Sequence, residues 1–289
     1  VAVLLTGTTT VGGLAKRADH IARVDIAGVI TGDERMLELL EQLEEADQVK
    51  AVLIKIDSPG GTTAGSEALY LSLRQLNEKK PVVTVMDTVA ASGGYITAIA
   101  ADHIVARGNT ITGSVGVLFQ WAQVQELLDT LGIEMQSIKS GALKAEPNLF
   151  EPTSERAREV TEQMVNDSFR WFMGLVEERR KLSPDQLRLI SDGRVFTGRQ
   201  AVEAQLVDEI GGEEEAKAWL AASRDVDEDL EIVDWDLESG LGEGGIGFAV
   251  LRAVLSALGF GEDSWIIEKI TAQERLSVDG LISVWHPDF

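Results

Sequence analysis

The stretch Ala90-Ala91-Ser92-Gly93-Gly94-Tyr95 places a serine between small residues at a predicted junction of strand and helix. An apolar run from Pro81 to Met86 precedes it and predicts a buried strand, and Tyr95 to Ala101 continues as a predicted helix. Small residues let the backbone approach a substrate closely, and N–H groups at a helix start favour negative charge. We therefore predict a tight turn at Ser92 that presents a hydroxyl for acyl transfer.

The chain on both sides of this turn alternates between strand and helix patterns. His20 to Ile30 and Val49 to Ile56 are predicted strands, and Asp33 to Ala46 and Ala64 to Asn77 are predicted helices. The second strand is almost wholly apolar, as buried parallel strands are. The sequence therefore predicts an α/β fold whose parallel sheet is connected by right-handed crossover helices.

A less regular region follows this alternation. Trp121 to Leu131 is a predicted helix, Glu134 to Ile138 a predicted strand, and Lys139 to Lys144 a predicted loop. A long amphipathic helix is predicted from Thr153 to about Lys181.

Composition excludes several classes of function. The 289 residues include 48 acidic and 26 basic side chains, for a net charge of −22, so the protein repels nucleic-acid phosphates. The absence of cysteine excludes disulfides, thiol catalysis and cysteine-ligated zinc. His20, His103 and His286 lack the spacing of metal ligands. We expect no metal and no cofactor.

Three segments are predicted. Residues 1–19 form an N-terminal stub, and apolar Val1 to Leu5 is either a disordered terminus or the last turn of a membrane anchor. Residues 20–221 form the main domain, and residues 222–289 form an acidic and apolar C-terminal extension with further helix. Its apolar helix from Ile246 to Phe260 would span roughly 22 Å, too short to cross a bilayer. We expect this helix either to pack on the main domain or on a neighbouring subunit, or to contact a membrane surface.

A serine nucleophile needs a base. His103 is interpreted as the first residue of a strand, whereas Lys144 lies in a loop between apolar neighbours. A lysine can serve as the base when burial lowers its pKa towards neutrality. The N–H of Gly93 is the expected donor to an oxyanion, with a second donor from Gly60 or Gly61 in the stretch Ser58-Pro59-Gly60-Gly61.

Four motifs in this order resemble one known family. They are Ser58-Pro59-Gly60-Gly61, Ala91-Ser92-Gly93-Gly94-Tyr95, Thr112-Gly113-Ser114-Val115-Gly116-Val117 and Ser140-Gly141-Ala142-Leu143-Lys144. From Ala22 to Trp219 the chain resembles the signal peptide peptidase A family of serine proteases, of the shorter, single-repeat type. The resemblance implies a Clp-protease/crotonase-like fold and a Ser–Lys dyad of Ser92 and Lys144. It also implies an oxyanion region at Gly93, Gly60 and Gly61, and a lysine-orienting hydroxyl on Ser114.

The resemblance also implies substrates, assembly and location. The substrates would be signal peptide remnants and other membrane-associated peptides. The dome-shaped homo-oligomeric ring, for example an octamer, would draw serine and lysine from adjacent subunits. The long helix from Thr153, with neighbouring Trp171 and Phe172, would then be an interface rather than an ordinary core helix. The protein would be associated with the bacterial inner membrane, with its catalytic domain on the periplasmic side.

Two other functions remain open at this point. A crotonase-type acyl-CoA enzyme would use the same backbone donors without a nucleophile, and a non-catalytic membrane scaffold would need neither Ser92 nor Lys144. A Clp-type protease is disfavoured because Val117 stands where its histidine would be.

Overall fold

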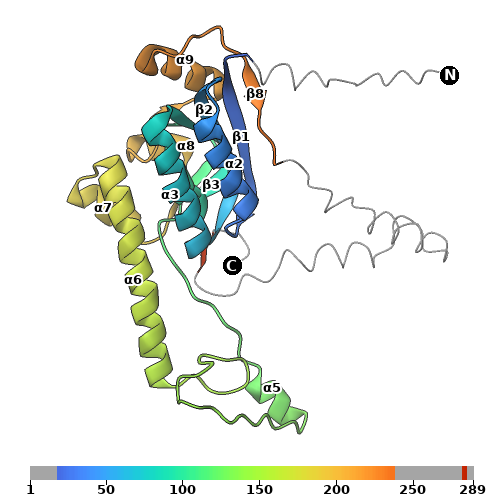
Figure 1. Ribbon diagram of the computed structural model, residues 1–289. Helices are drawn as coiled ribbons and strands as arrows, with labels where there is room; N and C mark the ends of the chain where they lie inside the picture. Colours follow the sequence, from blue (N-terminus) through green and yellow to red (C-terminus); the bar gives the residue numbers. More distant parts are fainter. Residues whose placement is uncertain (1–17, 238–281, 285–289) are drawn as a thin grey trace, which may run out of the picture.

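A single mixed sheet is the centre of the molecule (Figure 1). The computed structural model describes residues 18–237 and 282–284. The strands are β1 (His20–Ile30), β2 (Val49–Thr62), β3 (Val82–Ala91), β4 (His103–Ala106), β5 (Ile111–Gly113), β6 (Val195–Thr197), β7 (Glu209–Ile210), β8 (Ile232–Asp234) and β9 (Ile282–Val284). The order along the sheet is β6-β5-β3-β2-β1-β8, and β4, β7 and β9 join beside this path.

The central strands confirm the predicted parallel sheet. β1 pairs in parallel with β2, and β2 pairs in parallel with β3. Their apolar side chains are buried on both faces, which explains the unbroken apolar runs in the sequence. Within the described residues, antiparallel pairs occur only between β5 and β6 and between β2 and β9.

Helices cover both faces of this sheet (Figure 1). They are α2 (Glu34–Glu45), α3 (Thr63–Lys79), α4 (Gly93–Ala98), α5 (Gln125–Thr130), α6 (Glu155–Arg180), α7 (Pro184–Ile190), α8 (Gly198–Glu203) and α9 (Glu213–Arg224). The larger core contains apolar side chains of α2, α3 and α4. Ala216 and Leu220 of α9 belong to a second core with strand residues such as Leu53. The predicted α/β fold with crossover helices is therefore confirmed.

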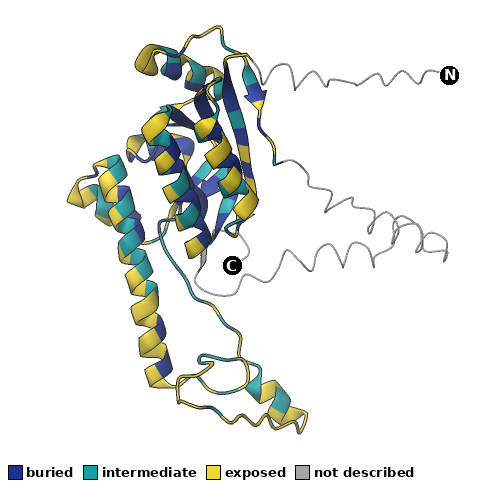
Figure 2. Ribbon diagram, in the orientation of Figure 1, coloured by how far each residue is buried: buried dark blue, intermediate teal, exposed yellow. Residues whose placement is uncertain are grey.

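An arm projects away from the sheet (Figures 1 and 2). We define it as residues 117–153, which include α5, together with the N-terminal half of α6. The predicted strand from Glu134 to Ile138 is wrong, because these residues form irregular backbone. They lie far from any strand that could pair with them (Figure 1). The helix predicted over Trp121 to Leu131 is shortened to α5.

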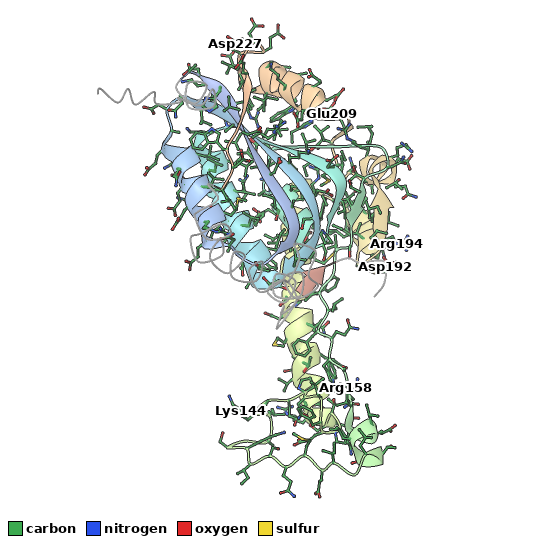
Figure 3. The ribbon with its side chains drawn as sticks, turned by 90° about the vertical axis from the view of Figure 1, so that its right-hand side faces the viewer. Lys144, Arg158, Asp192, Arg194, Glu209 and Asp227 are labelled. Carbon is green, nitrogen blue, oxygen red and sulfur yellow. The ribbon has the colours of Figure 1, made fainter. Side chains whose placement is uncertain are left out.

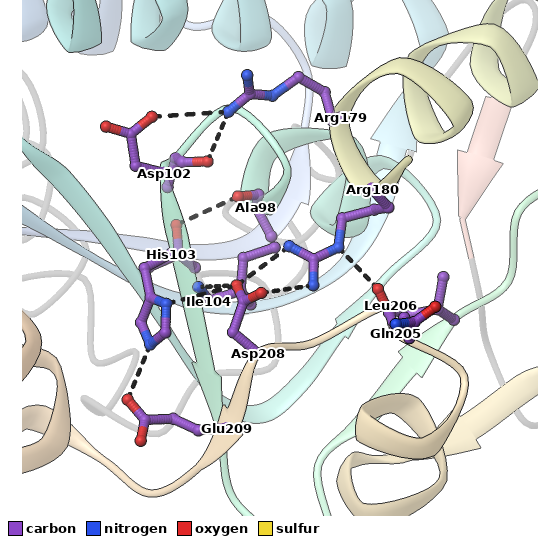
Figure 4. Close-up of polar contacts among 12 residues, drawn as sticks. Ala98, Asp102, His103, Ile104, Arg179, Arg180, Gln205, Leu206, Asp208 and Glu209 are labelled. Atoms are coloured by element: carbon purple, nitrogen blue, oxygen red, sulfur yellow. Dashed lines mark hydrogen bonds and ion pairs between the residues drawn. The ribbon is translucent and has the colours of Figure 1, made fainter. Parts of the chain in front are cut away.

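The C-terminal end of α6 attaches the arm to the sheet (Figure 4). Phe172 and Val176 are fully buried in the larger core. Arg179 donates to the carbonyl oxygens of Ile99 and Ala101, and Arg180 forms two hydrogen bonds with the Asp208 carboxylate. These contacts hold the C-terminal half of α6 against the sheet, while its N-terminal half belongs to the arm.

The chain beyond residue 221 returns to the sheet. β8 pairs in parallel with β1, and Trp235 donates from its indole N–H to Nε2 of buried His20 at 2.9 Å. The predicted helix from Ile246 to Phe260 and the apolar start of the chain lie outside the described residues. None of the described helices is long and apolar enough to span a membrane.

Candidate active site

Ser92 lies where β3 ends and α4 begins, as the sequence predicts. It has a φ of 56° and a ψ of −116°, an uncommon conformation for a residue other than glycine. Its N–H donates to the carbonyl oxygen of Gly113 at 2.8 Å, and its own carbonyl accepts from Ile96 N–H. A strained backbone of this kind costs on the order of 1–3 kcal/mol and is typical of functional turns. The turn is also deeply enclosed, since Ser92 is only 1% exposed.

Close packing requires the second glycine after Ser92. A Cβ atom on Gly94 would lie 2.6 Å from the carbonyl oxygen of Ser58. Gly93 is the first residue of α4, so its N–H precedes the first intrahelical bond, which Ile96 N–H makes to Ser92. The N–H of Gly93 is therefore at the place where a donor to an oxyanion beside Ser92 is expected.

The Gly60-Gly61 stretch runs beside this turn. Ser58 pairs with Ala90 across β2 and β3, so the residues after Ser58 and the residues after Ala90 start from neighbouring positions. Gly60 has a φ of 110° and donates its N–H to Ser58 Oγ at 3.1 Å. Gly61 lies against Ile30 of β1, where a Cβ atom would be 1.9 Å from the carbonyl oxygen. The stretch is a continuation of β2, which extends beyond the strand predicted from Val49 to Ile56.

Ser92 opens into a cavity of about 370 Å³ that Ser114 also lines. Ser114 has a φ of 52°, and its N–H donates to the carbonyl oxygen of Arg194 at 2.9 Å. The remaining wall comes from residues 115–118, from Val165, Asn166 and Phe169 of α6, and from the turn Ser191–Gly193. The structure thus brings the predicted nucleophile and the predicted orienting hydroxyl to one cavity.

Lys144 does not lie in this cavity. It is exposed and sits at the outer end of the arm, far from the sheet (Figure 3). Its N–H donates to the carbonyl oxygen of Gly141 in a turn, and the next residue, Ala145, has a φ of 58°. A single chain therefore does not bring Ser92 and Lys144 together, and the apolar enclosure expected for Lys144 is absent within one chain.

A second lysine in the same loop has a different environment. Lys139 Nζ lies 2.6 Å from the carboxylates of both Glu146 and Glu151. These partners raise the pKa of Lys139, and Lys139 lowers the pKa of Glu151 to about 2. Lys139 therefore stays protonated and stabilises the loop through these two ion pairs. A protonated lysine cannot accept a proton, so Lys139 is unsuitable as the base.

The two histidines within the described residues, His20 and His103, have structural positions. His103 begins β4, as predicted, and its Nε2 lies 2.8 Å from Glu209 (Figure 4). Its ring stacks on Trp219 with centroids 4.6 Å apart. His103 does not line the cavity at Ser92, and neither does buried His20.

The sequence reasoning missed the far wall of the cavity. Val165 and Phe169 are one helical turn apart on α6, so their shared face could be read from spacing. The Ser191–Gly193 turn reaches the cavity because β6 pairs antiparallel with β5, the strand that ends at Gly113. Only the tertiary structure reveals that approach.

Comparisons with known proteins relate this chain to a family of peptidases. The model of peptidase family S49 matches residues 74–227, more than half of the chain. A Synechocystis sp. protein named as a candidate protease is 36% identical over 74% of this chain and 78% of that protein. The chloroplastic serine protease SPPA of Arabidopsis thaliana is 34% identical over 62% of this chain and 27% of that protein. Protease 4 of Haemophilus influenzae is 28% identical over 76% of this chain and 37% of that protein.

A solved ClpP1 mutant from Listeria monocytogenes is similar in structure, with a TM-score of 0.45 and 18% identity, over 67% of this chain and 93% of that chain. The sequence comparisons confirm the family resemblance that the four motifs predict. The chain belongs to peptidase family S49 and is a peptidase.

Proposed function

We propose that this chain is a serine endopeptidase in which Ser92 is the nucleophile and Lys144 of a neighbouring copy is the general base. The observation that carries the proposal is the strained, enclosed turn at Ser92, which opens into the cavity that Ser114 shares. The match to family S49 spans this turn and Lys144.

The proposed chemistry uses these side chains, backbone N–H groups and water. Neutral Lys144 takes the proton of Ser92 as Oγ attacks the substrate carbonyl. The N–H of Gly93, with a second donor from Gly60 or Gly61, stabilises the oxyanion. The lysine ammonium then protonates the leaving amine, and an acyl-enzyme remains. Water hydrolyses this ester with the same lysine as base.

A second copy is proposed as the source of the lysine because of three features of one chain. Lys144 is exposed at the end of a long arm, no lysine of the described residues lines the cavity at Ser92, and large apolar side chains are exposed along the arm. A ring of copies would let each arm reach its neighbour's cavity and cover the apolar surface at the same time. Ser114 is positioned to hold the incoming amine, since a hydroxyl oxygen accepts from it.

The substrates we propose are extended apolar peptides such as signal peptide remnants and other membrane-associated peptides. The cavity wall offers Val115, Val165 and Phe169 to apolar side chains. The family resemblance supports this substrate class, together with a location at the outer face of the bacterial inner membrane and contact with the membrane surface.

Covalent labelling tests the nucleophile directly. A fluorophosphonate should modify the protein once per site, and mass spectrometry of the digest should place the adduct on Ser92. Ser92→Ala should remain unlabelled, whereas Ser66→Ala, which changes a buried serine of α3, should still be labelled. Labelling that persists in Ser92→Ala, or labelling absent from the wild type, would contradict the proposal. The second result would reopen the acyl-CoA and scaffold alternatives.

A further inference from the structure

The loop that carries Lys144 at the outer end of the arm has a polar interior and an apolar exterior (Figure 3). Lys139, Glu146 and Glu151 are partly buried in it, and the Glu146 side chain is only 7% exposed. Large apolar side chains of the same loop are exposed, namely Ile138, Leu143, Leu149 and Phe150. Most protein segments show the opposite arrangement. The shape of this loop therefore depends on its polar contacts and not on an apolar core.

Glu146 is the centre of these polar contacts. Its Oε1 accepts hydrogen bonds from Lys139 Nζ at 2.6 Å and from Asn148 Nδ2 at 3.0 Å. Asn148 Oδ1 in turn accepts from the backbone N–H groups of Phe150 and Glu151, at 2.8 and 2.9 Å. Hydrogen bonds to a charged partner are the stronger ones, so the contact of Glu146 with Lys139 is the main link across the loop.

The turn at Lys144 lies inside the segment that Lys139 and Glu146 close. The N–H of Lys144 donates to the carbonyl oxygen of Gly141 at 3.0 Å. The N–H of Glu146 donates to the carbonyl oxygen of Leu143 at 3.4 Å. Glu146 therefore holds this turn through its backbone and through its side chain.

The second carboxylate oxygen of Glu146 is not explained by stability. Oε2 is buried and has no hydrogen-bond partner within the described residues. A buried acceptor without a donor lowers the stability of a fold. Such atoms are rare in proteins, and a functional role is one explanation for them.

We propose that Glu146 is a positioning residue, which fixes the turn at Lys144 so that the amine enters the cavity of the neighbouring copy in a defined place. This inference rests on the proposed function and adds a residue to it. A displacement of a reacting group by about 1 Å can lower a rate on the order of a hundredfold, so a loop that is ordered before assembly favours proton transfer. Glu146 then acts in the copy that supplies the lysine, and not in the copy that supplies the serine.

Placing Glu146→Ala in one of two protomers tests this inference. A mixture of Ser92→Ala and Lys144→Ala protomers has junctions in which the first supplies the lysine and the second supplies the serine. Glu146→Ala is added either to the lysine-supplying protomer or to the serine-supplying protomer, whose own lysine is already absent. We expect kcat for a short alanine- and leucine-rich peptide to fall about twentyfold in the first mixture and to change less than about twofold in the second, with KM unchanged in both. Equal losses in the two mixtures would overturn the inference, because an effect on folding or assembly acts in both.

Two further variants of the lysine-supplying protomer are the controls. Glu146→Gln keeps an oxygen that accepts from Lys139 and Asn148, so it should retain most of the activity that Glu146→Ala loses. Glu134→Ala removes an exposed carboxylate of the same arm and should leave the rate unchanged. A loss in Glu134→Ala as large as in Glu146→Ala would assign the effect to the charge of the arm and overturn the inference.

Hydrogen exchange separates this inference from the proposed function. In the single variant Glu146→Ala, the backbone N–H of Lys144 should exchange at least about tenfold faster than in the wild type, whereas β2 and β3 should exchange at the wild-type rate. Unchanged exchange at Lys144 would overturn the inference even if the enzyme proves to be a peptidase with a Ser–Lys dyad. If every mixture is inactive, the proposed assignment of the base to a neighbouring copy fails, while the exchange rate still decides whether Glu146 holds the turn.

Discussion

The sheet and the arm differ in how far their apolar side chains are buried. In the sheet, the apolar residues of β2 and β3 are almost completely buried between helices. In the arm, large apolar side chains are exposed, namely Leu127, Leu131, Ile133, Met135, Ile138, Leu143, Leu149, Phe150, Val160 and Met164. So many exposed apolar residues in one region are typical of an interaction surface. The sheet thus forms its own core, whereas the arm presents apolar surface that a neighbouring molecule could bury.

The proposed catalytic groups are divided between these two regions. Ser92 and Ser114 belong to the sheet, and Lys144 belongs to the arm. In the proposed enzyme, the folding of one chain builds half of each site, and assembly supplies the other half. The following predictions test this division, beginning with the largest expected effect.

Removal of the Ser92 hydroxyl should abolish peptidase activity. We expect Ser92→Ala to lower kcat by at least about a thousandfold, because no other group would take over the covalent step. The variant should melt like the wild type or slightly higher, since the positive φ is uncommon for both residues. The measurements are peptide cleavage by mass spectrometry and thermal unfolding by circular dichroism. Activity above a few per cent of the wild-type rate would show that the nucleophile is another residue.

Removal of the Lys144 amine should lower peptidase activity almost as much, and a second copy with an intact Lys144 should restore part of that activity. Lys144→Ala and Lys144→Arg should both be inactive, since a guanidinium does not deprotonate in proteins. Mixing Lys144→Ala with Ser92→Ala protomers should restore part of the activity, because some junctions then pair wild-type Ser92 with wild-type Lys144. Mixed oligomers can be verified by native mass spectrometry. Verified mixed oligomers without activity would place both groups of the dyad in one chain or remove Lys144 from the mechanism.

A charge on the arm should weaken assembly without unfolding the sheet. Ile138 is fully exposed, so Ile138→Asp should leave the melting temperature of the sheet unchanged while it lowers the fraction of oligomer. The matched control is Leu71→Asp on α3, where the side chain is 58% exposed on the sheet body. Sedimentation velocity measures both variants. Equal effects of the two substitutions on mass would contradict a special role for the arm.

Acid should loosen the arm loop in which Lys139 and Glu151 form an ion pair. Lys139 lowers the pKa of Glu151 to about 2 from 4.5, so the ionised carboxylate stabilises the fold above about pH 4.5. That stabilisation declines below pH 4.5 and is lost as the pH falls through about 2. Hydrogen exchange of residues 137–151, corrected for intrinsic rates, should therefore accelerate in this range. Lys139→Met should exchange faster at pH 6 and show a weaker dependence on pH, whereas the same pH dependence in both proteins would assign the effect to another pair.

Sequence reasoning succeeded where local pattern and burial agree. The apolar runs of β2 and β3 predict buried parallel strands, and small residues around Ser92 predict the strand-to-helix turn. It failed for Glu134 to Ile138, which lies in an arm without neighbouring strands. A residue pattern describes the segment alone, whereas a strand also requires a partner for its backbone groups.

The sequence by itself determined the α/β class, the turn at Ser92 and the family, because each depends on residue types at short range. The tertiary structure alone decided three further features. Ser114 shares the cavity of Ser92, Lys144 stands apart from both, and Ile282–Val284 lies against Gly60–Thr62. These relations join residues distant in the chain. They depend on which strand edges and helix faces remain open after the core has formed, and no local pattern encodes that.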